Sequence, residues 1–349
     1  MKRVGILGLP QSGKSTLFEI LMQGAGTHHG PAHEQVGVVR VPDERVDRLS
    51  ALFQPKKTTY AQVQFVDSAA AGHASARAAA KGPDLFLSVR NCDAFLAVVR
   101  DFESLAVAAA GGVDAARDLR DLQAEFILND LGIVEARLER VAKELRVGKK
   151  EHEREHAALE RVRTLLEAER PLRAESFDAE EEKLLRGFQL LSRKPLLVVY
   201  NQDEASTRVP PPGGSGTLAL ALKAHTEREI VALPPEERAA FRAELGVTGD
   251  GLSLMIRACY ELLGLISFFT VGPDEVRAWT LHRGEKAVDA AAEIHTDLAK
   301  GFIRAEVIAW DRLLEAGGTA KAREKAWLRL EGRDYLVQDG DCIEIRFNK

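Results

Sequence analysis

The sequence predicts an α/β fold with a mainly parallel sheet, an inserted antiparallel helical hairpin and a smaller β-rich domain at the carboxyl end. Short apolar runs alternate with helical or loop segments, which is typical of parallel α/β sheets. A heptad-like repeat interrupts these runs, and beyond about residue 268 short strands and turns take over. With 349 residues, of which 45% are hydrophobic, the chain is long enough for two or three domains.

The first predicted strand and helix enclose a phosphate-binding motif. Val4 to Leu7 is an apolar run typical of a buried strand, and Ser15 to Met22 has the apolar spacing of a helix. Between them, Gly8 to Ser15 fits the pattern G-x-x-x-x-G-K-[ST] in full. Its glycines let backbone N–H groups turn toward a phosphate, and the helix start adds a partial positive charge. We therefore predict a nucleotide site at this loop.

Each fixed position of this pattern has a chemical role. We predict that Lys14 reaches the β- and γ-phosphates and that the hydroxyl of Ser15 binds Mg²⁺. The predicted ligand is ATP or GTP, and the predicted cofactor is Mg²⁺. The residues predicted to contact phosphate are Gly8, Gln11, Ser12, Gly13, Lys14, Ser15 and Thr16.

Three further apolar runs continue the predicted sheet: Val63 to Val66, Ala94 to Val99 and Leu196 to Tyr200. Asp67 closes the first of them beside the phosphate loop, where its carboxylate can hold the Mg²⁺ shell. The alternative is a helix cap or an acid of a surface loop. In GTPases this aspartate begins D-x-x-G, but here the fourth position is Ala70, which keeps an N–H and adds a Cβ.

A predicted base-binding motif follows the run that ends at Tyr200, and it consists of Asn201, Gln202 and Glu204. Nucleotide-binding G domains have N-K-x-D at this place, and the aspartate accepts two hydrogen bonds from guanine. The longer carboxylate of Glu204 displaces that bidentate contact. Polar groups that are not correctly paired with the base discriminate poorly between guanine and other bases. We therefore predict little selectivity for guanine.

A heptad seam separates the second of these runs from the third. Its apolar residues recur every three or four positions, stop at Gly148 and then resume, which predicts an antiparallel helical hairpin inserted into the α/β domain. The charged residues of the hairpin form either a solvated face or a partner surface. The seam consists of Leu131, Val134, Leu138, Val141 and Leu145, followed by Leu159, Val162 and Leu166.

Charge, cysteine content and hydropathy restrict the partners and the compartment. The 48 basic and 53 acidic residues give a net charge of −5, so any contact with RNA must use a local patch. Cys92, Cys259 and Cys342 fit no metal-ligand spacing and no disulfide framework. The sequence shows no signal-peptide core and no segment of membrane-spanning length. We expect a cytoplasmic protein without membrane contact.

Three histidines, His28, His29 and His33, lie in a stretch rich in Gly and Pro. They could be metal ligands, or they could belong to a flexible, solvated loop. Glu34 is the one acid close by, and no cysteine or carboxylate arrangement completes a metal site, which favours the loop.

Together these residues resemble the YchF family of Obg-related ATPases, which are P-loop proteins with an inserted helical hairpin and a carboxyl-terminal TGS domain of β-grasp fold. The resemblance covers nearly the whole chain. It implies a P-loop NTPase G domain at residues 1–120 and 195–267, a coiled-coil insertion at 121–194 and a TGS domain at 268–349. The matching stretches are GLPQSGKSTLF at 8–18, VGVVRVPDERVDRL at 36–49, NCDAFLAVVR at 91–100, NQDE at 201–204, DEVRAWT at 274–280, IHTDLAKGFIRAEV at 294–307 and EGRDYLVQDGD at 331–341.

The resemblance also implies a partner and a nucleotide preference. Family members accept ATP in preference to GTP or alongside it, and they associate with ribosomes. We expect a monomer that contacts the ribosome or RNA through the helical hairpin and the TGS domain, and that contact should weaken with salt. The basic residues of the predicted TGS domain considered for this role are Arg277, Lys286, Lys300 and Arg304.

The chain departs from the family pattern at residues linked to catalysis. Gln11 replaces an asparagine associated with potassium coordination, and Pro31 stands where the first switch has a threonine. Ala71 offers no polar group where many GTPases have a glutamine, and Ala108 stands where the family has a histidine proposed to orient water. Two functions therefore remain open: a slow ATPase that acts as a switch on the ribosome, and a hydrolysis-deficient paralogue that acts as a nucleotide-bound interaction protein.

Overall fold

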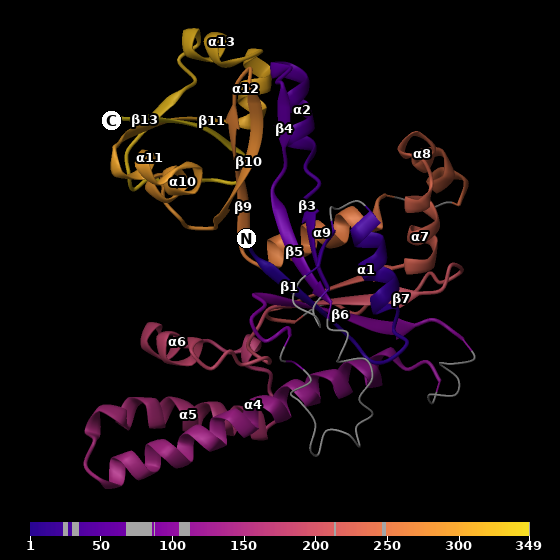
Figure 1. Cartoon of the computed structure of the whole chain (residues 1–349), viewed down its shortest axis with the longest axis vertical. Helices are drawn as coiled ribbons and strands as arrows, with labels where there is room; N and C mark the ends of the chain where they lie inside the picture. The colour runs from indigo at the N-terminus through magenta and orange to yellow at the C-terminus, as the bar shows by residue number, and fades with distance from the viewer. Residues whose placement is uncertain are drawn as a thin grey trace. The chain divides into compact units, whose positions relative to one another are not determined.

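The computed structural model describes residues 1–23, 35–67, 86, 88–104, 112–212, 214–245 and 249–348, together with the backbone of 27–29. The chain divides into two compact units. The first unit comprises Met1–Val39 and Gln64–Met255, and the second comprises Arg40–Val63 and Ile256–Lys349. Each unit contains its own sheet (Figure 1).

The sheet of the first unit has seven strands in the order β2-β3-β5-β1-β6-β7-β8. Strands β5, β1, β6, β7 and β8 pair in parallel, whereas β2 and β3 pair antiparallel, so the predicted mainly parallel sheet is confirmed. The central strands are buried along most of their length, as their apolar runs predict. The strands are β1 (Arg3–Leu7), β2 (Thr27–His29), β3 (Gln35–Arg40), β5 (Gln62–Asp67), β6 (Ala94–Asp101), β7 (Leu196–Gln202) and β8 (Thr217–Leu222).

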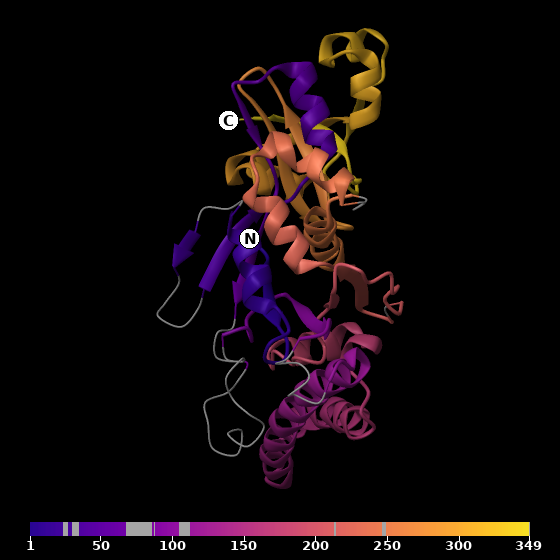
Figure 2. The ribbon, with the colours of Figure 1, turned by 90° about the vertical axis from the view of Figure 1, so that its right-hand side faces the viewer.

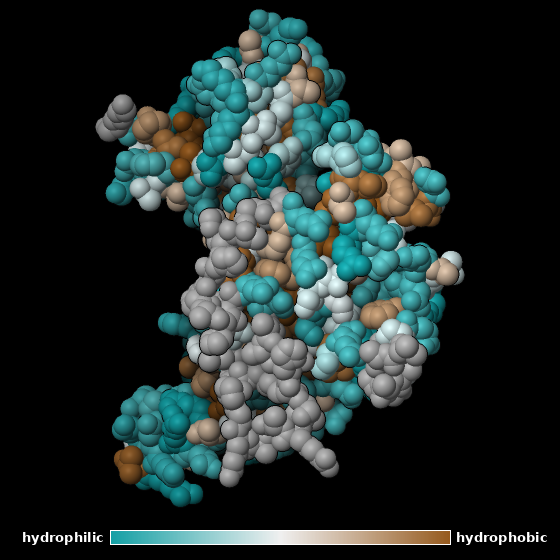
Figure 3. Space-filling view, turned by 45° about the vertical axis from the view of Figure 1, so that its right-hand side comes forward, coloured by the Kyte–Doolittle hydropathy of each residue, from teal (hydrophilic) through white to brown (hydrophobic). Residues whose placement is uncertain are grey.

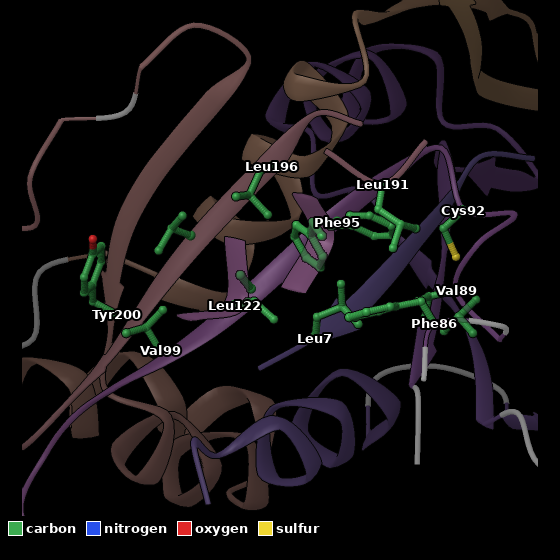
Figure 4. Packing of buried hydrophobic residues seen from close by; sticks show 14 residues of the cluster. Leu7, Phe86, Val89, Cys92, Phe95, Val99, Leu122, Leu191, Leu196 and Tyr200 are labelled. Atoms are coloured by element: carbon green, nitrogen blue, oxygen red, sulfur yellow. The ribbon is translucent and has the colours of Figure 1, made fainter. Parts of the chain in front are cut away.

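One face of this sheet packs against the long helix α4 (Ala115–Arg146). Phe95 of β6 and Phe126 of α4 meet with their ring centroids 5.4 Å apart. Leu7 and Leu196 join the same buried cluster from the neighbouring strands, as Figure 4 shows. Helices α1 (Lys14–Gln23) and α7 (Ala224–Ala232) pack against each other, and α8 (Pro235–Glu244) and α9 (Gly251–Leu262) follow α7 along the chain.

The predicted helical hairpin is confirmed. Helices α4 and α5 (Glu153–Glu167) lie side by side in two perpendicular views (Figure 1, Figure 2), and α6 (Ala179–Arg186) follows α5. The seam residues Val134, Val141 and Val162 are fully buried between the helices. Gly148 stands in the turn with a φ of 89°, a conformation that glycine adopts without strain. Because α4 also packs on the sheet, the hairpin continues directly from the core of the first unit.

The sheet of the second unit has six strands in the order β12-β11-β13-β9-β10-β4. Helix α10 (Ala287–Ile294) covers its core through small residues, among them Ala287, Ala290 and Ala291. The β-rich carboxyl-terminal domain is thereby confirmed. Its strands are β4 (Lys57–Thr59), β9 (Leu265–Val271), β10 (Glu275–His282), β11 (Phe302–Ala309), β12 (Arg329–Glu331) and β13 (Asp341–Phe347), and its other helices are α2 (Glu44–Phe53), α11 (Thr296–Lys300), α12 (Trp310–Ala316) and α13 (Thr319–Glu324).

Strand β4 joins this sheet from a distant part of the sequence, which no local pattern indicated. It pairs in parallel with β10, with Lys57 opposite Glu275 and Thr59 opposite Arg277. The hydroxyl of Thr59 donates a hydrogen bond of 2.6 Å to the Glu275 carboxylate. The strand is short and polar, as edge strands often are. Residues 40–63 therefore group with the second unit, while the domain bounds inferred from the sequence remain a prediction.

Two further sequence-based expectations concern the whole chain. The side chains of Cys92, Cys259 and Cys342 are buried, and no disulfide bond joins any two of them. Within the described residues, no helix combines the length and the apolar character needed to cross a membrane.

Candidate functional site

The predicted phosphate loop connects the end of β1 to the start of α1. Gly8 and Gly13 have φ angles of 153° and 95°, which residues with a side chain rarely adopt. A Cβ at Gly8 would overlap the carbonyl oxygen of Val98, and a Cβ at Gly13 would overlap the side-chain amide of Asn201. Both glycines are therefore required by close approach as well as by backbone conformation.

Lys14 is folded over the loop that precedes it. Its ammonium group donates hydrogen bonds to the carbonyl oxygens of Gly8 at 2.8 Å and Leu9 at 2.9 Å. The residue is only 8% exposed, and this burial lowers the pKa of Lys14, an effect that the nearby Asp67 carboxylate opposes and Arg100 reinforces. The cation is thus held at the place where the motif predicts contact with phosphate.

Ser12 has a buried hydroxyl without a hydrogen-bond partner among the described residues. Its backbone N–H donates to the carbonyl oxygen of Leu9 at 3.3 Å. Buried polar atoms are paired in the great majority of cases, and an unpaired one calls for a specific explanation, such as a catalytic role or a bound water or ion. The orphaned hydroxyl fits a loop that receives phosphate oxygens.

A pocket of about 830 Å³ opens above this loop. One wall is the loop itself, the predicted base motif forms the opposite wall, and α7 closes one side through Ala224, His225 and Arg228. This volume lies in the range of nucleotide and cofactor sites. The predicted residues that line the pocket are Gln11, Ser12, Gly13, Lys14, Ser15, Thr16, Asn201, Gln202 and Glu204.

Asn201 connects the two walls of the pocket. Its side-chain amide donates a hydrogen bond of 3.1 Å to the carbonyl oxygen of Ser12, and its side-chain oxygen accepts one of 3.1 Å from the N–H of Ala224. The side chain thereby ties the phosphate loop to the start of α7. Its contact with a base stays a prediction, and its bonds within the protein are an additional role that the motif alone did not indicate.

Gln202 and Glu204 differ in burial and in partners. Gln202 is buried, and its side-chain amide donates hydrogen bonds to the Asp101 carboxylate at 2.8 Å and to the carbonyl oxygen of Arg208 at 3.0 Å. Glu204 is exposed at the mouth of the pocket, with its carboxylate 3.0 Å from Nδ1 of His225. No motif in the sequence indicates a role for His225, because this residue lies on a separate helix. The one feature that could have pointed to it is its place at the start of α7.

Asp67 ends β5 at the edge of the sheet where the phosphate loop begins. It stands opposite Ile6 of β1 in the parallel register, and its side chain is buried. This position brings a carboxylate to the same end of the sheet as Lys14 and Ser15. Carboxylate and hydroxyl oxygens are ligands that Mg²⁺ accepts, so the residues present fit that ion.

A buried ion pair lies beside the phosphate loop, and no motif in the sequence indicates it. Nε of Arg100, at the end of β6, lies 2.6 Å from the carboxylate of Asp118 in the first turn of α4. Both side chains are at least nine-tenths buried, with 6% and 3% exposed. A lone arginine in an apolar run gives no motif, so only the fold brings it together with its partner. The pair fixes the start of α4 next to the phosphate loop.

Several predicted positions fall outside the described residues: Pro31, His33, Ala70, Ala71 and Ala108. For His28 and His29 the structure describes the backbone alone, in β2. Among the side chains that are described, one cluster of acids and histidine could hold a metal ion, and it consists of the exposed residues Glu204, His225 and Glu229. Exposed groups of this kind are common without a metal, and the cluster differs from the predicted Mg²⁺ ligands.

A glycine-rich loop between a central parallel strand and the helix after it, with a lysine at the start of the helix, defines a P-loop nucleotide-binding protein of the α/β class. The chain is 39% identical over 362 residues to the ribosome-binding ATPase YchF of Bacillus subtilis (strain 168), an alignment that covers 99% of this chain and 98% of the relative. The protein of the same name from Escherichia coli O157:H7 is 35% identical, with 99% of each chain covered. The chain belongs to the YchF family.

Two further comparisons agree with this assignment. The solved structure of the Schizosaccharomyces pombe YchF GTPase superposes with a TM-score of 0.83 at 27% identity, and it covers 99% of this chain and 97% of that one. The family model YchF-GTPase_C, described as a protein of unknown function (DUF933), matches residues 265–348. The predicted resemblance and the predicted fold class are both confirmed.

Proposed function

We propose that this chain binds a nucleoside triphosphate, ATP, GTP or both, together with Mg²⁺, and acts as a slow NTPase that regulates or accompanies the ribosome. The observation that carries the proposal is the phosphate loop, in which Lys14 is held over Gly8 and Leu9 beneath an open pocket. The names of the bacterial relatives, ribosome-binding ATPase YchF, support the choice of nucleotide and partner.

The pocket supports binding through the phosphates more strongly than through the base. Backbone N–H groups, Lys14 and the buried hydroxyl of Ser12 surround the phosphate end, and Ser15 with Asp67 would hold Mg²⁺ there. A bound Mg²⁺ would neutralise phosphate charge. At the base end, Gln202 uses its amide within the protein and Glu204 is exposed beside His225. We therefore expect weak discrimination between adenine and guanine.

Hydrolysis of the bound nucleotide is expected to be very slow. The sequence retains the residues predicted to bind the ground state, but Ala71 and Ala108 offer no polar group to orient water. The loss of one stabilising group typically costs ~10²–10³ in rate. Single-turnover assays with radiolabelled ATP and GTP, with and without potassium and ribosomes, measure this rate. Fast hydrolysis that disappears in Lys14→Ala would contradict the expectation, and His28, His29 and His33 would be mutated next. No hydrolysis under any condition would favour the alternative of a nucleotide-bound interaction protein.

Ribosome association is supported by basic and aromatic side chains that pair in the second unit. The guanidinium of Arg277 lies 3.8 Å from the ring centroid of Trp279, and the ammonium of Lys325 lies 4.5 Å from that of Trp327. Such pairs suit RNA, which is bound through phosphate charge and base stacking. Of the other predicted residues, Lys286 pairs with Asp334 at 2.7 Å, so it contributes less free charge.

The helical hairpin is the other candidate contact surface. Hydrophilic side chains cover most of the part of the hairpin that Figure 3 shows, and Val147 in its turn is 75% exposed. Lys149 and Lys150 in the same turn are exposed as well. A solvated face and a partner surface both account for these residues, and the following experiment separates them.

Co-sedimentation of the full chain with ribosomes tests both surfaces. We expect pelleting that weakens with salt. We expect Arg277→Glu with Lys325→Glu to weaken this pelleting. In a plot of the logarithm of the binding constant against the logarithm of the salt concentration, the slope should become less steep by about one for each phosphate group that the protein no longer neutralises. Lys149→Glu with Lys150→Glu tests the hairpin in the same way. If the first pair of substitutions has no effect, the second unit is not the interface. If the unmodified chain does not pellet, the ribosomal partner is wrong.

A further inference from the structure

Glu204 and His225 meet at the base end of the nucleotide pocket. The carboxylate oxygen Oε1 of Glu204 lies 3.0 Å from Nδ1 of His225, and both residues line the pocket. A carboxylate accepts hydrogen bonds and does not donate them, so Nδ1 carries the hydrogen of this bond. One oxygen of the carboxylate is therefore bonded within the protein before any base is bound. The proposed function gives His225 no role.

The surroundings of this pair hold it in place. Lys223, immediately before α7, donates a hydrogen bond of 2.5 Å from its ammonium group to the carbonyl oxygen of Glu204. His225 stands in the first turn of α7, and the start of this helix is tied to the phosphate loop through Asn201. The imidazole of His225 and the backbone of Glu204 are therefore both held by a helix start that is fixed relative to the phosphate loop.

Other acids near the pair do not replace this contact. Glu229, one turn further along α7, lies 3.9 Å from Nδ1 of His225, which is beyond hydrogen-bond distance. The carboxylate of Asp203, the residue before Glu204, accepts a hydrogen bond of 3.1 Å from the backbone N–H of Glu103. Among the described residues, His225 is the one side chain that forms a hydrogen bond with the Glu204 carboxylate.

Guanine and adenine differ in what they require from such a carboxylate. Guanine presents two neighbouring donors, its N1–H and its N2 amino group, and the two oxygens of a free carboxylate can accept a bond from each. Adenine presents one amino group, N6, next to the acceptor N1. When one oxygen of the carboxylate is held by the protein, guanine loses one of its two bonds, whereas a base with a single amino donor loses none.

We propose that His225 is a positioning residue for Glu204: it keeps one oxygen of the carboxylate occupied and thereby lowers the affinity for GTP relative to ATP. The inference rests on the proposed nucleotide site and names the side chain that sets its base preference. The side chains of His225 and Glu204 are 58% and 65% exposed, so their bond is worth little free energy and the effect is about three- to fivefold in relative affinity.

Displacement of a fluorescent ATP analogue from the full chain by ATP, GTP and inosine triphosphate (ITP), with Mg²⁺ present, tests the proposal. We expect His225→Ala to raise the affinity for GTP relative to ATP about three- to fivefold, because both Glu204 oxygens become free. ITP lacks the N2 amino group of guanine. GTP and ITP should therefore bind the unmodified chain about equally, whereas GTP should bind the His225→Ala chain more tightly than ITP. A general loss of structure would weaken all three nucleotides together.

A double-mutant cycle with Glu204→Ala isolates the contribution of the pair. Once the carboxylate is absent, His225→Ala should leave the affinity for GTP relative to ATP unchanged. His156→Ala is the matched control, because His156 lies on α5, outside the residues that line the pocket, and its imidazole also faces a carboxylate, that of Glu160. This control should leave the relative affinities of all three nucleotides unchanged.

The outcomes separate this inference from the proposed function. If the unmodified chain binds no nucleotide, the proposed site and the inference are both wrong. If the nucleotides bind but His225→Ala leaves the affinity for GTP relative to ATP within about twofold, or lowers it, the inference is overturned and the site stands. An equal rise in the Glu204→Ala background would also overturn it, because His225 would then act on the base without the carboxylate.

Discussion

Replacing Lys14 by alanine is expected to weaken the binding of ATP and GTP together, by roughly 30-fold to several-thousand-fold. The loss of a buried, charge-assisted contact with phosphate costs about 2–5 kcal/mol of binding free energy. Lys14 is the cation that the fold holds above the loop, through its bonds to Gly8 and Leu9. Titration of the full chain with fluorescent ATP and GTP analogues in the presence of Mg²⁺ measures both affinities.

A matched control separates this effect from a general loss of charge. Lys183 is exposed on α6, away from the residues that line the nucleotide pocket, so Lys183→Ala should leave both affinities unchanged. If Lys14→Ala binds both nucleotides as tightly as the unmodified chain, the loop between β1 and α1 is not the site.

Replacing Asp118 by alanine is expected to destabilise the first unit by about 3–5 kcal/mol. The substitution leaves the buried guanidinium of Arg100 without the carboxylate that lies 2.6 Å from it. Removing one member of a buried pair is costly because the remaining charge stays desolvated. Urea unfolding followed by far-UV circular dichroism gives the free energy. Trp279, Trp310 and Trp327 all lie in the second unit, so tryptophan fluorescence follows the unfolding of that unit. It serves as the internal reference for the substitution in the first unit.

The control for this prediction is an exposed ion pair in the same unit. Arg154 of α5 and Glu180 of α6 pair at the surface with side chains 78% and 67% exposed, so Glu180→Ala should change the free energy of unfolding by less than about 1 kcal/mol. Equal effects of the two substitutions would show that the Arg100–Asp118 pair contributes no more than a surface contact.

The features that could be predicted are those encoded in short stretches of sequence. The phosphate loop is specified by the pattern from Gly8 to Ser15, and the glycine positions follow from the backbone conformations they adopt. The hairpin is specified by its apolar spacing, and Gly148 marks its turn. In both cases neighbouring residues carry the whole signal, so the structure agrees with the prediction.

The features that could not be predicted depend on contacts between distant residues. Strand β4 is too short and polar to be recognised before its pairing with β10 is known. The motif predicts that Asn201 contacts the nucleotide base. Only the fold shows that its side chain also joins Ser12 to the start of α7. The contact between Glu204 and His225 is likewise a property of the packed structure, since the two residues are distant in the sequence.

Competitive equilibrium dialysis of the full chain with radiolabelled ATP and Mg²⁺ tests most directly whether the pocket holds a nucleotide by its phosphates. The structure predicts one saturable site per chain, from which unlabelled GTP displaces ATP with an affinity within about a hundredfold of it, because the phosphate end is complete while Glu204 is exposed at the base end. Absence of saturable binding would contradict the phosphate site. A preference for GTP above about a hundredfold, about 2.7 kcal/mol, would show that Glu204 still recognises guanine.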